Sequence, residues 1–552
     1  TTIEAQIKTR FGSIPAPASP RPRPSFTVPD QPGTAYSVIT DPETTRALVS
    51  VTNTRTAREQ RTVGAYRRRM VEQLFAAMLS ARLDEIAQAP NAPFLQAQTD
   101  RSLFVRTIEV TGFAALVATD GVERGLSALF TELARVSRFG FTAGELSRMK
   151  LNLQRGLERS VVEKDKSPSG PLADEFIRAF IEEEPIPGIV YEFGLNQRFL
   201  PEITLAEVNA VATDWMPDRN RVVAISAPES EKAALPDDVT LAGLISAATT
   251  ERLTAYVDTA SNKPLLASAP AAGSVATVST ADTLGITEWR LSNGARVVLK
   301  PTTFKQDEIL FRAVSAGGTS LASDEDFIAG DTADAVIAQG GIGSLSRLDL
   351  EKVLAGTTAS VRANIGDTEE GLAGGAARKD LETMFQLIYL TFTAPRADPV
   401  AFGVLTDQLK VTLANRQGQP DALFNEALDA ALSQNHPRTQ PLTPAGIEGM
   451  DLGKSLAFYK ERFADAGDFT FFFVGRFGLA TMQPLVVRYL ASLPSQNRRE
   501  EARDVGIRPP AGVVEKEGRS GIAPRSQVSI GFTGPIQHDG QQRLIATAMG
   551  DT

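Results

Sequence analysis

The apolar positions of the chain are spaced for long helices in some stretches and for strands in others. From residue 59 to residue 88 they recur every three or four positions, which predicts an amphipathic helix. Apolar and polar residues alternate over 94–99 and again over 103–117, which predicts a pair of strands arranged as a hairpin. A second hairpin is predicted at 289–299, because its centre is the Asn-Gly dipeptide typical of a two-residue turn.

Two stretches of about 200 residues each repeat one order of elements. Each begins with strands and continues with long helices. Their second halves match most clearly. Each contains a helix, a proline-containing turn, a second helix, a loop, a third helix and a closing strand. The closing strand is predicted at 221–227 in one copy and at 469–474 in the other. The offset is about 250 residues, which is too long for a solenoid repeat. The pattern therefore predicts a duplicated α+β domain.

Three segments are predicted as connectors between these copies and beyond them. Residues 15–32 are rich in proline, which excludes a helix and favours an extended path. Residues 236–281 are rich in Ala, Ser, Thr, Asp and Pro, the composition of a solvated linker. Residues 494–510 contain a charged run that ends in two prolines. Within the first copy, Asp120 and Thr142 are predicted as N-caps of two helices.

Composition excludes several classes of protein. The chain has 552 residues, a formal net charge of −9, no cysteine and only two histidines, His436 and His538. Without a basic stripe it is not expected to bind nucleic acid, and no apolar run approaches the roughly 18 residues of a membrane span. The lack of cysteine excludes disulfides and thiolate chemistry. Two distant histidines are too few for a catalytic triad or for most transition-metal sites.

Short segments along the chain resemble one protein family in their order and spacing. They are Ile14–Pro17, Arg82–Ile86, Ala92–Phe94, Leu291–Val297, Gly317–Ser320, Thr391–Asp398, Asn435–Arg438, Tyr459–Phe463, Phe473–Gly475 and Tyr489–Pro494. In these segments the chain resembles the M16 (pitrilysin or insulinase-type) zinc metallopeptidases, most closely the multidomain members of the bacterial periplasm. The resemblance extends over nearly the whole chain, and its specificity comes from the order of the segments.

The resemblance implies an α+β fold of repeated M16-type (LuxS/MPP-like) domains, each a mostly antiparallel sheet packed with helices. In that family four such domains enclose an unfolded peptide, and the first domain carries the zinc motif His-x-x-Glu-His. The chain is therefore expected to be a piece of a longer polypeptide. The implied division is 1–25 for the end of the first domain and its proline-rich exit, 26–235 for the second domain, 236–281 for a linker, 282–497 for a degenerate third domain and 498–552 for the start of a truncated fourth.

The sequence offers no zinc ligand, catalytic residue or cofactor-binding residue of the family type. His-x-x-Glu-His is absent, and in the third domain the motif positions fall on 331–335, where Asp331 and Asp334 stand with Ala335. These two carboxylates are expected to cap a helix and to be solvated, and the alternative is a pair for acid/base chemistry. Zinc is expected in the parent protein, held by ligands that this chain does not contain.

The remaining candidate residues are expected to have structural roles. His436 and His538 lie in loops and are expected to anchor them or to face solvent. The glycine-rich tract 371–376 lacks the Lys-Ser/Thr of a phosphate-binding loop and is expected to be a flexible loop at a chamber wall. The basic run 67–69 lies on a helix with acidic neighbours, so a solvated face is expected.

The leading hypothesis is the central, non-catalytic portion of an M16-like zinc metalloendopeptidase that encloses and cleaves unfolded peptides. The chain alone is expected to be inactive, with the peptide substrate and the missing first and fourth domains as its partners. An alternative is a non-catalytic binding or assembly subunit that pairs with a separate zinc-bearing M16 chain. An independent hydrolase using carboxylates is disfavoured, because no carboxylate cluster stands out. A periplasmic location is expected from the resemblance and suits a chain without cysteine.

Overall fold

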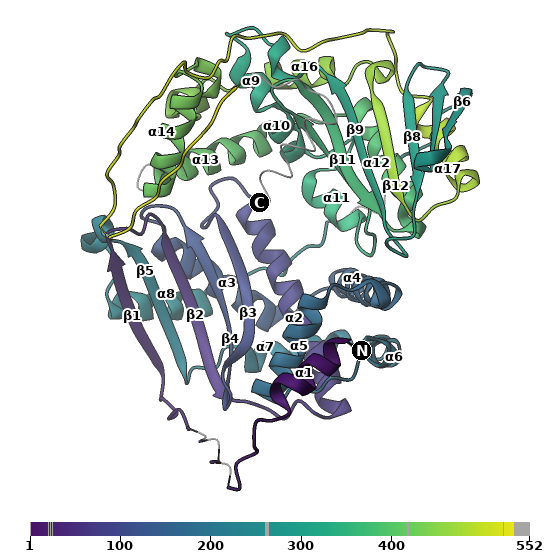
Figure 1. The fold of residues 1–552 in the computed structure, drawn as a ribbon. Coiled ribbons are helices and arrows are strands. Elements are labelled where there is room, and N and C mark those ends of the chain that lie inside the picture. Colours follow the sequence, from purple (N-terminus) through teal and green to yellow (C-terminus); the bar gives the residue numbers. More distant parts are fainter. Residues whose placement is uncertain are drawn as a thin grey trace.

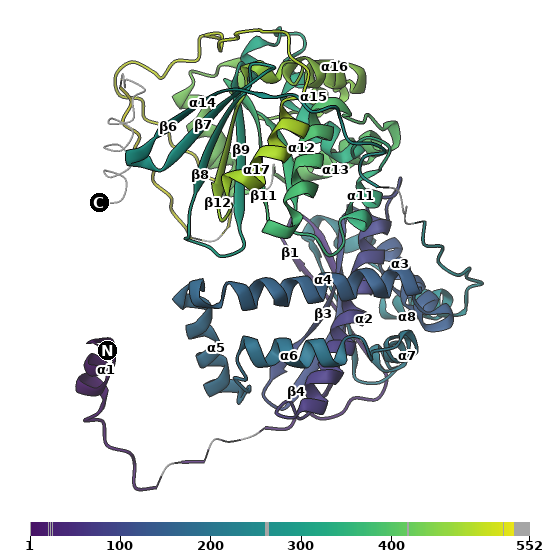
Figure 2. The ribbon, with the colours of Figure 1, turned by 90° about the vertical axis from the view of Figure 1, so that its right-hand side faces the viewer.

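The chain forms two α+β bodies joined by an extended segment (Figure 1). The computed structural model describes residues 2–19, 21–22, 24, 26–259, 264–416, 419–522 and 524–534. We call residues 34–250 the first body and residues 275–493 the second body. Ahead of them, helix α1 (Thr2–Phe11) lies away from both bodies at the end of a long extended stretch (Figure 2).

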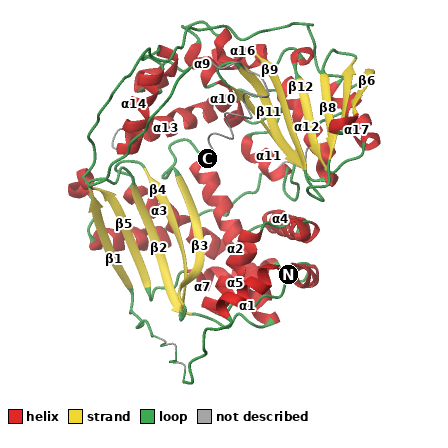
Figure 3. Cartoon of the chain, in the orientation of Figure 1, coloured by secondary structure: helices red, strands yellow, loops and turns green. Residues whose placement is uncertain are grey.

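The first body contains one five-stranded sheet in the order β1-β5-β2-β4-β3 (Figure 3). Its strands are β1 (Thr34–Asp41), β2 (Ala47–Thr56), β3 (Gln96–Val105), β4 (Ile108–Val117) and β5 (Arg221–Pro228). Its helices are α2 (Val63–Ala87), α3 (Val122–Phe139), α4 (Ala143–Val162), α5 (Ser169–Glu182), α6 (Ile189–Phe199), α7 (Leu205–Trp215) and α8 (Asp238–Thr250). Helices α2 and α3 pack against the sheet, and α7 and α8 pack against them in turn.

The second body contains a seven-stranded sheet in the order β10-β11-β9-β12-β8-β7-β6. Its strands are β6 (Val275–Ala281), β7 (Ile286–Leu291), β8 (Arg296–Pro301), β9 (Ile309–Ala316), β10 (Ser360–Ile365), β11 (Glu369–Ala376) and β12 (Thr470–Gly475). Its helices are α9 (Phe327–Asp331), α10 (Ala333–Gly340), α11 (Arg347–Val353), α12 (Leu381–Thr393), α13 (Pro399–Arg416), α14 (Pro420–Leu432), α15 (Pro444–Glu448), α16 (Leu452–Arg462) and α17 (Leu479–Leu485).

The strand topology confirms the predicted duplication. Read from β3 to β1, the first sheet has the same order as the second sheet from β10 to β8. In both sheets the parallel pair lies at the same place, β1 with β5 and β8 with β12, while the other neighbours in the shared part pair antiparallel. The second sheet adds the hairpin-like strands β6 and β7 at its edge. The predicted α+β fold class is therefore confirmed.

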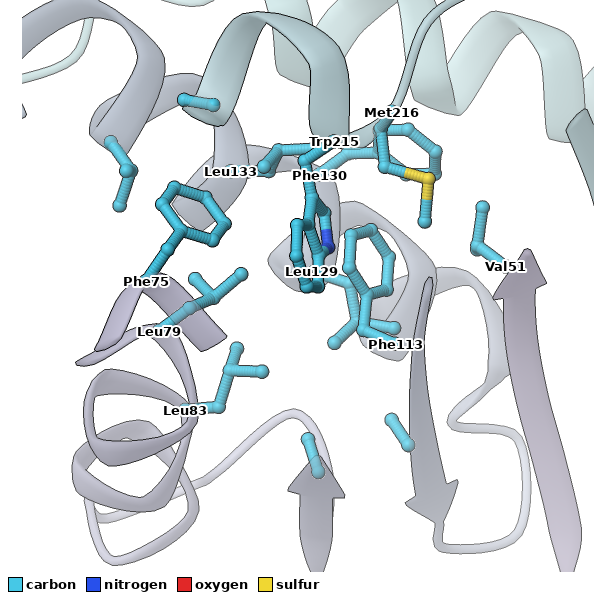
Figure 4. Packing of buried hydrophobic residues seen from close by; sticks show 14 of the residues in the cluster. Val51, Phe75, Leu79, Leu83, Phe113, Leu129, Phe130, Leu133, Trp215 and Met216 are labelled. Carbon is cyan, nitrogen blue, oxygen red and sulfur yellow. The ribbon is translucent and has the colours of Figure 1, made fainter. Parts of the chain in front are cut away.

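Each body is built around its own hydrophobic core. In the first, Trp215 packs against Phe75 with ring centroids 4.9 Å apart, and Phe113 meets Phe130 edge-on at 5.6 Å (Figure 4). The second core contains Trp289 and a series of phenylalanines from β9, β12 and α12. The buried residues of one core do not include residues of the other. Each body can therefore bury its apolar surface without the other.

Two local expectations were wrong. The glycine-rich tract 371–376 is not a flexible loop but part of β11, between β10 and β9. A Cβ at Gly374 would lie 1.9 Å from the carbonyl oxygen of Ser360, so only glycine allows this approach of the strands. Asp120 does not cap α3: its backbone is left-handed, with φ 58°, and the N-cap residue is Gly121. Thr142, in contrast, does form a capping box at the start of α4.

The segments predicted as a linker and as the start of a fourth domain also differ from expectation. Residues 236–281, predicted as a linker, contain helix α8 and strand β6, and α8 buries Leu241 and Ile245 in the first core. Of the segment predicted to begin a fourth domain, residues 498–522 and 524–534 run extended without helix or strand, and the remainder lies outside the described residues.

Candidate functional site: the junction between the two bodies

The positions that resemble the zinc motif do not form a metal site. Asp331 ends α9, and Asp334 lies in the first turn of α10. The carboxylate of Asp334 accepts hydrogen bonds from the backbone N–H of Ile365 at 3.2 Å and of Ala335 at 2.6 Å, so it ties α10 to the end of β10 rather than capping the helix. Among the described residues, no group of three or more His, Cys, Asp or Glu side chains is arranged to hold a metal ion. The residues present therefore do not fit the zinc site of the family.

The other sequence candidates have structural partners. The ring of His436 accepts a hydrogen bond from the backbone N–H of Arg438, and its Nε2 lies 3.0 Å from the carbonyl oxygen of Val505, so it anchors a loop to the extended segment. His538 lies outside the described residues. In the basic run, Arg67 forms an ion pair with Glu207 at 2.7 Å, and Arg68 donates to the carbonyl oxygen of Glu59 at 2.9 Å.

Helix α4 of the first body makes one of the contacts with the second body. The capping box fixes its start: the Thr142 hydroxyl accepts from the backbone N–H of Glu145, and the Glu145 carboxylate accepts from that of Thr142. Figure 2 shows the helix running beneath the second body. Its later turns carry Arg155, Arg159 and Glu163, all of which contact residues of the second body.

Arg155 is the central side chain of this junction. It is 6% exposed, and its Nη2 lies 3.3 Å from a carboxylate oxygen of Asp307 and 3.3 Å from one of Asp380. Asp380 is itself oriented by Thr358, which donates to it from the backbone N–H at 2.9 Å and from the hydroxyl at 2.8 Å. A buried guanidinium is thus held between two carboxylates of the other body. On the same helix, Glu158 pairs with Lys379 of the second body at 2.7 Å.

Backbone groups of the second body complete the contact with α4. The Glu163 carboxylate accepts from the backbone N–H of Gln306 at 2.8 Å and of Asp307 at 2.6 Å. The backbone N–H of Gly356 donates to Asn152 at 2.7 Å. Gly356 has φ +79°, and a Cβ there would lie 2.9 Å from the Leu151 Cβ, so glycine is required for this close approach.

A second cluster lies where the end of α2 meets α11. The Tyr256 hydroxyl donates to the Glu85 carboxylate at 2.9 Å, and Lys352 of the second body pairs with the same carboxylate at 2.7 Å. Burial and the Glu85 charge raise the pKa of Tyr256 above its ordinary value, so the hydroxyl keeps its proton and acts as a donor. Arg347 adds a hydrogen bond to Gln88 at 3.1 Å.

The junction is held by ion pairs and hydrogen bonds, and no cluster of buried hydrophobic residues in the described part of the chain spans it. Interfaces of this kind between domains bury little apolar surface and allow the domains to move. The two bodies are thus connected by directional contacts that can separate as a unit, while the two cores stay intact. The geometry is that of a polar contact between two domains.

Sequence reasoning missed the residues of the junction. Arg155 and Asp380 are 225 positions apart and belong to no spacing motif. One signal was present: the segment Arg82–Ile86 belongs to the family resemblance, and the structure shows Arg82 and Glu85 in buried or interfacial contacts.

The comparisons with known proteins find similarity to zinc proteases. It is 24% identical over 548 residues to the zinc protease PQQL-like of Arabidopsis thaliana, which covers 97% of this chain and 51% of that protein. It is 23% identical over 498 residues to the probable zinc protease PqqL of Haemophilus influenzae, covering 89% of this chain and 53% of that protein. The chain thus spans about half the length of these curated relatives. No family model matches the chain.

Among solved structures, a mutant of the ferredoxin protease FusC in complex with Arabidopsis ferredoxin has a TM-score of 0.57 and 19% sequence identity, covering 91% of this chain and 56% of that chain. This likeness shows that the duplicated fold is shared. The relatives found by sequence are thus named as zinc proteases, and the solved structure that shares the fold is named as a ferredoxin protease. These similarities support the resemblance of the chain to the M16 (pitrilysin or insulinase-type) peptidases.

Proposed function

We propose that the chain is the central, non-catalytic portion of an M16-type zinc metalloendopeptidase. In this proposal, 26–235 and 282–497 are the second and third domains, 1–25 ends the first domain and 498–552 begins the fourth. The observation that carries it concerns Asp331 and Asp334, which occupy the motif positions of a family-type domain. The carboxylate of Asp334 holds α10 to the end of β10 instead. That the chain covers only about half of its relatives supports the same reading.

The role of the portion is to form a chamber wall and the hinge that connects the two halves of the enzyme. The polar junction at Arg155, Asp307 and Asp380 supports this role, because the bodies meet through contacts that can open without exposing a core. The parent enzyme would bind zinc through its first domain and cleave unfolded peptides. A periplasmic location is proposed from the sequence similarity to PqqL of Escherichia coli, which is a periplasmic protease. No helix among the described residues is long and apolar enough to cross a membrane.

The deciding experiment is the intact mass and N-terminal sequence of the native polypeptide, together with its zinc content. The proposal expects a much larger polypeptide with an upstream His-x-x-Glu-His and about one zinc ion per chain. The isolated chain of 552 residues should not cleave an unfolded protein substrate. A native product of this length without zinc would contradict the proposal and favour an assembly subunit that pairs with a separate zinc-bearing chain.

A further inference from the structure

A small pocket opens on the second body beside the junction, at the carboxyl ends of the parallel strands β8 and β12. Its volume is about 330 Å³. It is lined by Pro301, Thr302, Thr303, Arg378, Arg476, Phe477 and Gly478. This volume is at the lower limit for a ligand pocket and accommodates a group of one or two amino-acid residues.

The pocket lining includes two arginines, Arg378 and Arg476. The acidic side chains nearest to them are already paired with arginines of the first body. The backbone N–H of Arg378 donates to Asp307, but the other oxygen of Asp307 faces Arg155 of the first body. The backbone of Arg476 is bonded to the carbonyl of Glu308, whose carboxylate pairs with Arg159. Within the described part of the chain, neither the Arg378 nor the Arg476 guanidinium has an ion-pair partner or a hydrogen-bond acceptor. The junction thus neutralises the local acids and leaves two cationic side chains facing the pocket.

We propose that this pocket binds the carboxylate of a peptide. Guanidinium forks match a carboxylate geometrically and bind it by two parallel hydrogen bonds. The hydroxyls of Thr302 and Thr303 supply additional donors beside them. Phe477 and Pro301 give the pocket an apolar wall, which suits a carboxylate attached to an organic group rather than a bare inorganic anion.

The carboxylate can belong to the C-terminus of a peptide or to an Asp or Glu side chain, since both present the same two oxygens. The assumption that the bound carboxylate belongs to a peptide rests on the proposed function. Because the pocket lies beside the junction, an occupied pocket would place one peptide end next to the contact between the two bodies. The pocket requires no zinc, and its test is independent of peptidase activity.

The test measures binding of short peptides to the full chain by fluorescence anisotropy. Three N-terminally fluorescein-labelled probes separate the sources: Gly-Gly-Ala-Phe with a free carboxylate, the same peptide as its carboxamide, and the carboxamide of Gly-Glu-Ala-Phe. The variants are Arg378→Ala, Arg476→Ala and the double variant. Arg362→Ala, an exposed arginine on β10 of the same body, is the matched control for loss of one positive charge. Circular dichroism establishes that each variant is folded.

We expect the free acid to bind and each single variant to raise its Kd about tenfold or more, as for loss of a charge-assisted hydrogen bond. Arg362→Ala should leave the Kd unchanged. Binding of the internal-Glu carboxamide would assign the pocket to side-chain carboxylates, and its failure to bind would assign it to C-termini. Equal affinity for the free acid and the plain carboxamide would overturn the proposal that this pocket binds a carboxylate. An unchanged Kd in the double variant would overturn it as well. Neither result bears on the zinc content or mass of the parent, so failure here is distinguishable from failure of the proposed function.

Discussion

Arg155 of the first body and Asp380 of the second body meet at 3.3 Å, and both side chains are almost completely buried. Arg155 is on α4. Asp380 immediately precedes α12, which packs on the sheet of the second body. A buried charge pair across a domain junction contributes little when intact, but removing one partner leaves an uncompensated buried charge. The contact therefore specifies how the two bodies are oriented more than it adds to their stability.

Replacing Arg155 by methionine should separate the two bodies. The change keeps an unbranched apolar stem but leaves Asp307 and Asp380 without their shared cation, at a cost of about 3–5 kcal/mol. Because the chain has no cysteine, Asp218→Cys and Glu325→Cys can be labelled specifically at exposed sites, one on each body. Single-molecule energy transfer between the labels should report a longer and broader distance distribution.

The matched control for this change is Arg159→Met on the same helix. Arg159 pairs with Glu308 across the same junction, but its side chain is 49% exposed. Exposed pairs contribute about 0–1 kcal/mol, so the label distance should remain that of the unsubstituted chain. If Arg155→Met left the distribution unchanged, the junction would be held by the backbone contacts at Glu163 and Gly356 instead.

A second prediction concerns Glu370, a buried carboxylate on β11. It accepts a hydrogen bond from the backbone N–H of Gly318 at 2.7 Å, and Arg462 lies 4.0 Å away but is also paired with Glu500 at 3.0 Å. Burial raises the pKa of Glu370 from its ordinary value of 4.5 to about 7. Between these pH values the folded state keeps a proton that the unfolded state has released.

The free energy of unfolding of the second body should therefore fall as pH rises from about 4.5 to 7, by at most about 1.4 kcal/mol per pH unit. Glu370→Gln mimics the protonated form, so it should remove this slope and be more stable than the unsubstituted chain at pH 8. Each body contains one tryptophan, and in a Trp215→Phe background Trp289 reports urea unfolding of the second body alone. Glu369→Gln, at a half-exposed neighbouring position, should retain the slope. If the free energy of unfolding of Glu370→Gln fell with pH as steeply as that of the unsubstituted chain, Glu370 would not be the source of the pH dependence.

The order of elements was predictable from the sequence because apolar spacing encodes each helix and strand locally. The capping box at Thr142 and the hairpin at 289–299 were predictable for the same reason. Strand β11 was not, because its glycines carry neither β-branching nor alternation, and what requires them is a neighbouring backbone far along the chain. Arg155 was missed because its partners come from a different body, and no local pattern distinguishes a buried arginine on α4 from a solvated one.

The role of glycine in β11 leads to a third prediction. Gly374→Ala would place a methyl group 1.9 Å from the carbonyl oxygen of Ser360, so β10 and β11 must shift apart. We expect a loss of about 1–3 kcal/mol in the second body, as for overpacking of a tight contact. The control is Gly194→Ala in α6, where no atom lies within 4 Å of the added methyl, and which should stabilise the first body by about 0.5–1 kcal/mol. Urea unfolding followed at Trp289 and Trp215 separates the two effects; a neutral Gly374→Ala would show that the tract tolerates a side chain.

The last prediction concerns Arg82, whose guanidinium is buried in the first body. It donates to both oxygens of Glu145, at 2.7 and 3.0 Å, and to Glu132 at 3.0 Å, and it lies over the ring of Tyr256 at 4.2 Å. Despite these partners, burial raises the pKa of Glu132 above its ordinary value. Arg82→Met removes the cation from two buried carboxylates and should destabilise the first body by about 3–5 kcal/mol at pH 8.

This deficit should depend on pH in a definite direction. Without Arg82 the pKa of Glu132 rises further in the folded state, so the folded variant takes up a proton that the unfolded chain does not hold. The variant should therefore recover part of its stability at pH 5, whereas an apolar packing defect would cost the same at both pH values. Urea unfolding followed at Trp215 in a Trp289→Phe background measures the free energy of unfolding at pH 5 and at pH 8. Adding Glu132→Gln to Arg82→Met should restore part of the lost stability at pH 8, because it removes one of the two buried carboxylates that have lost the Arg82 cation.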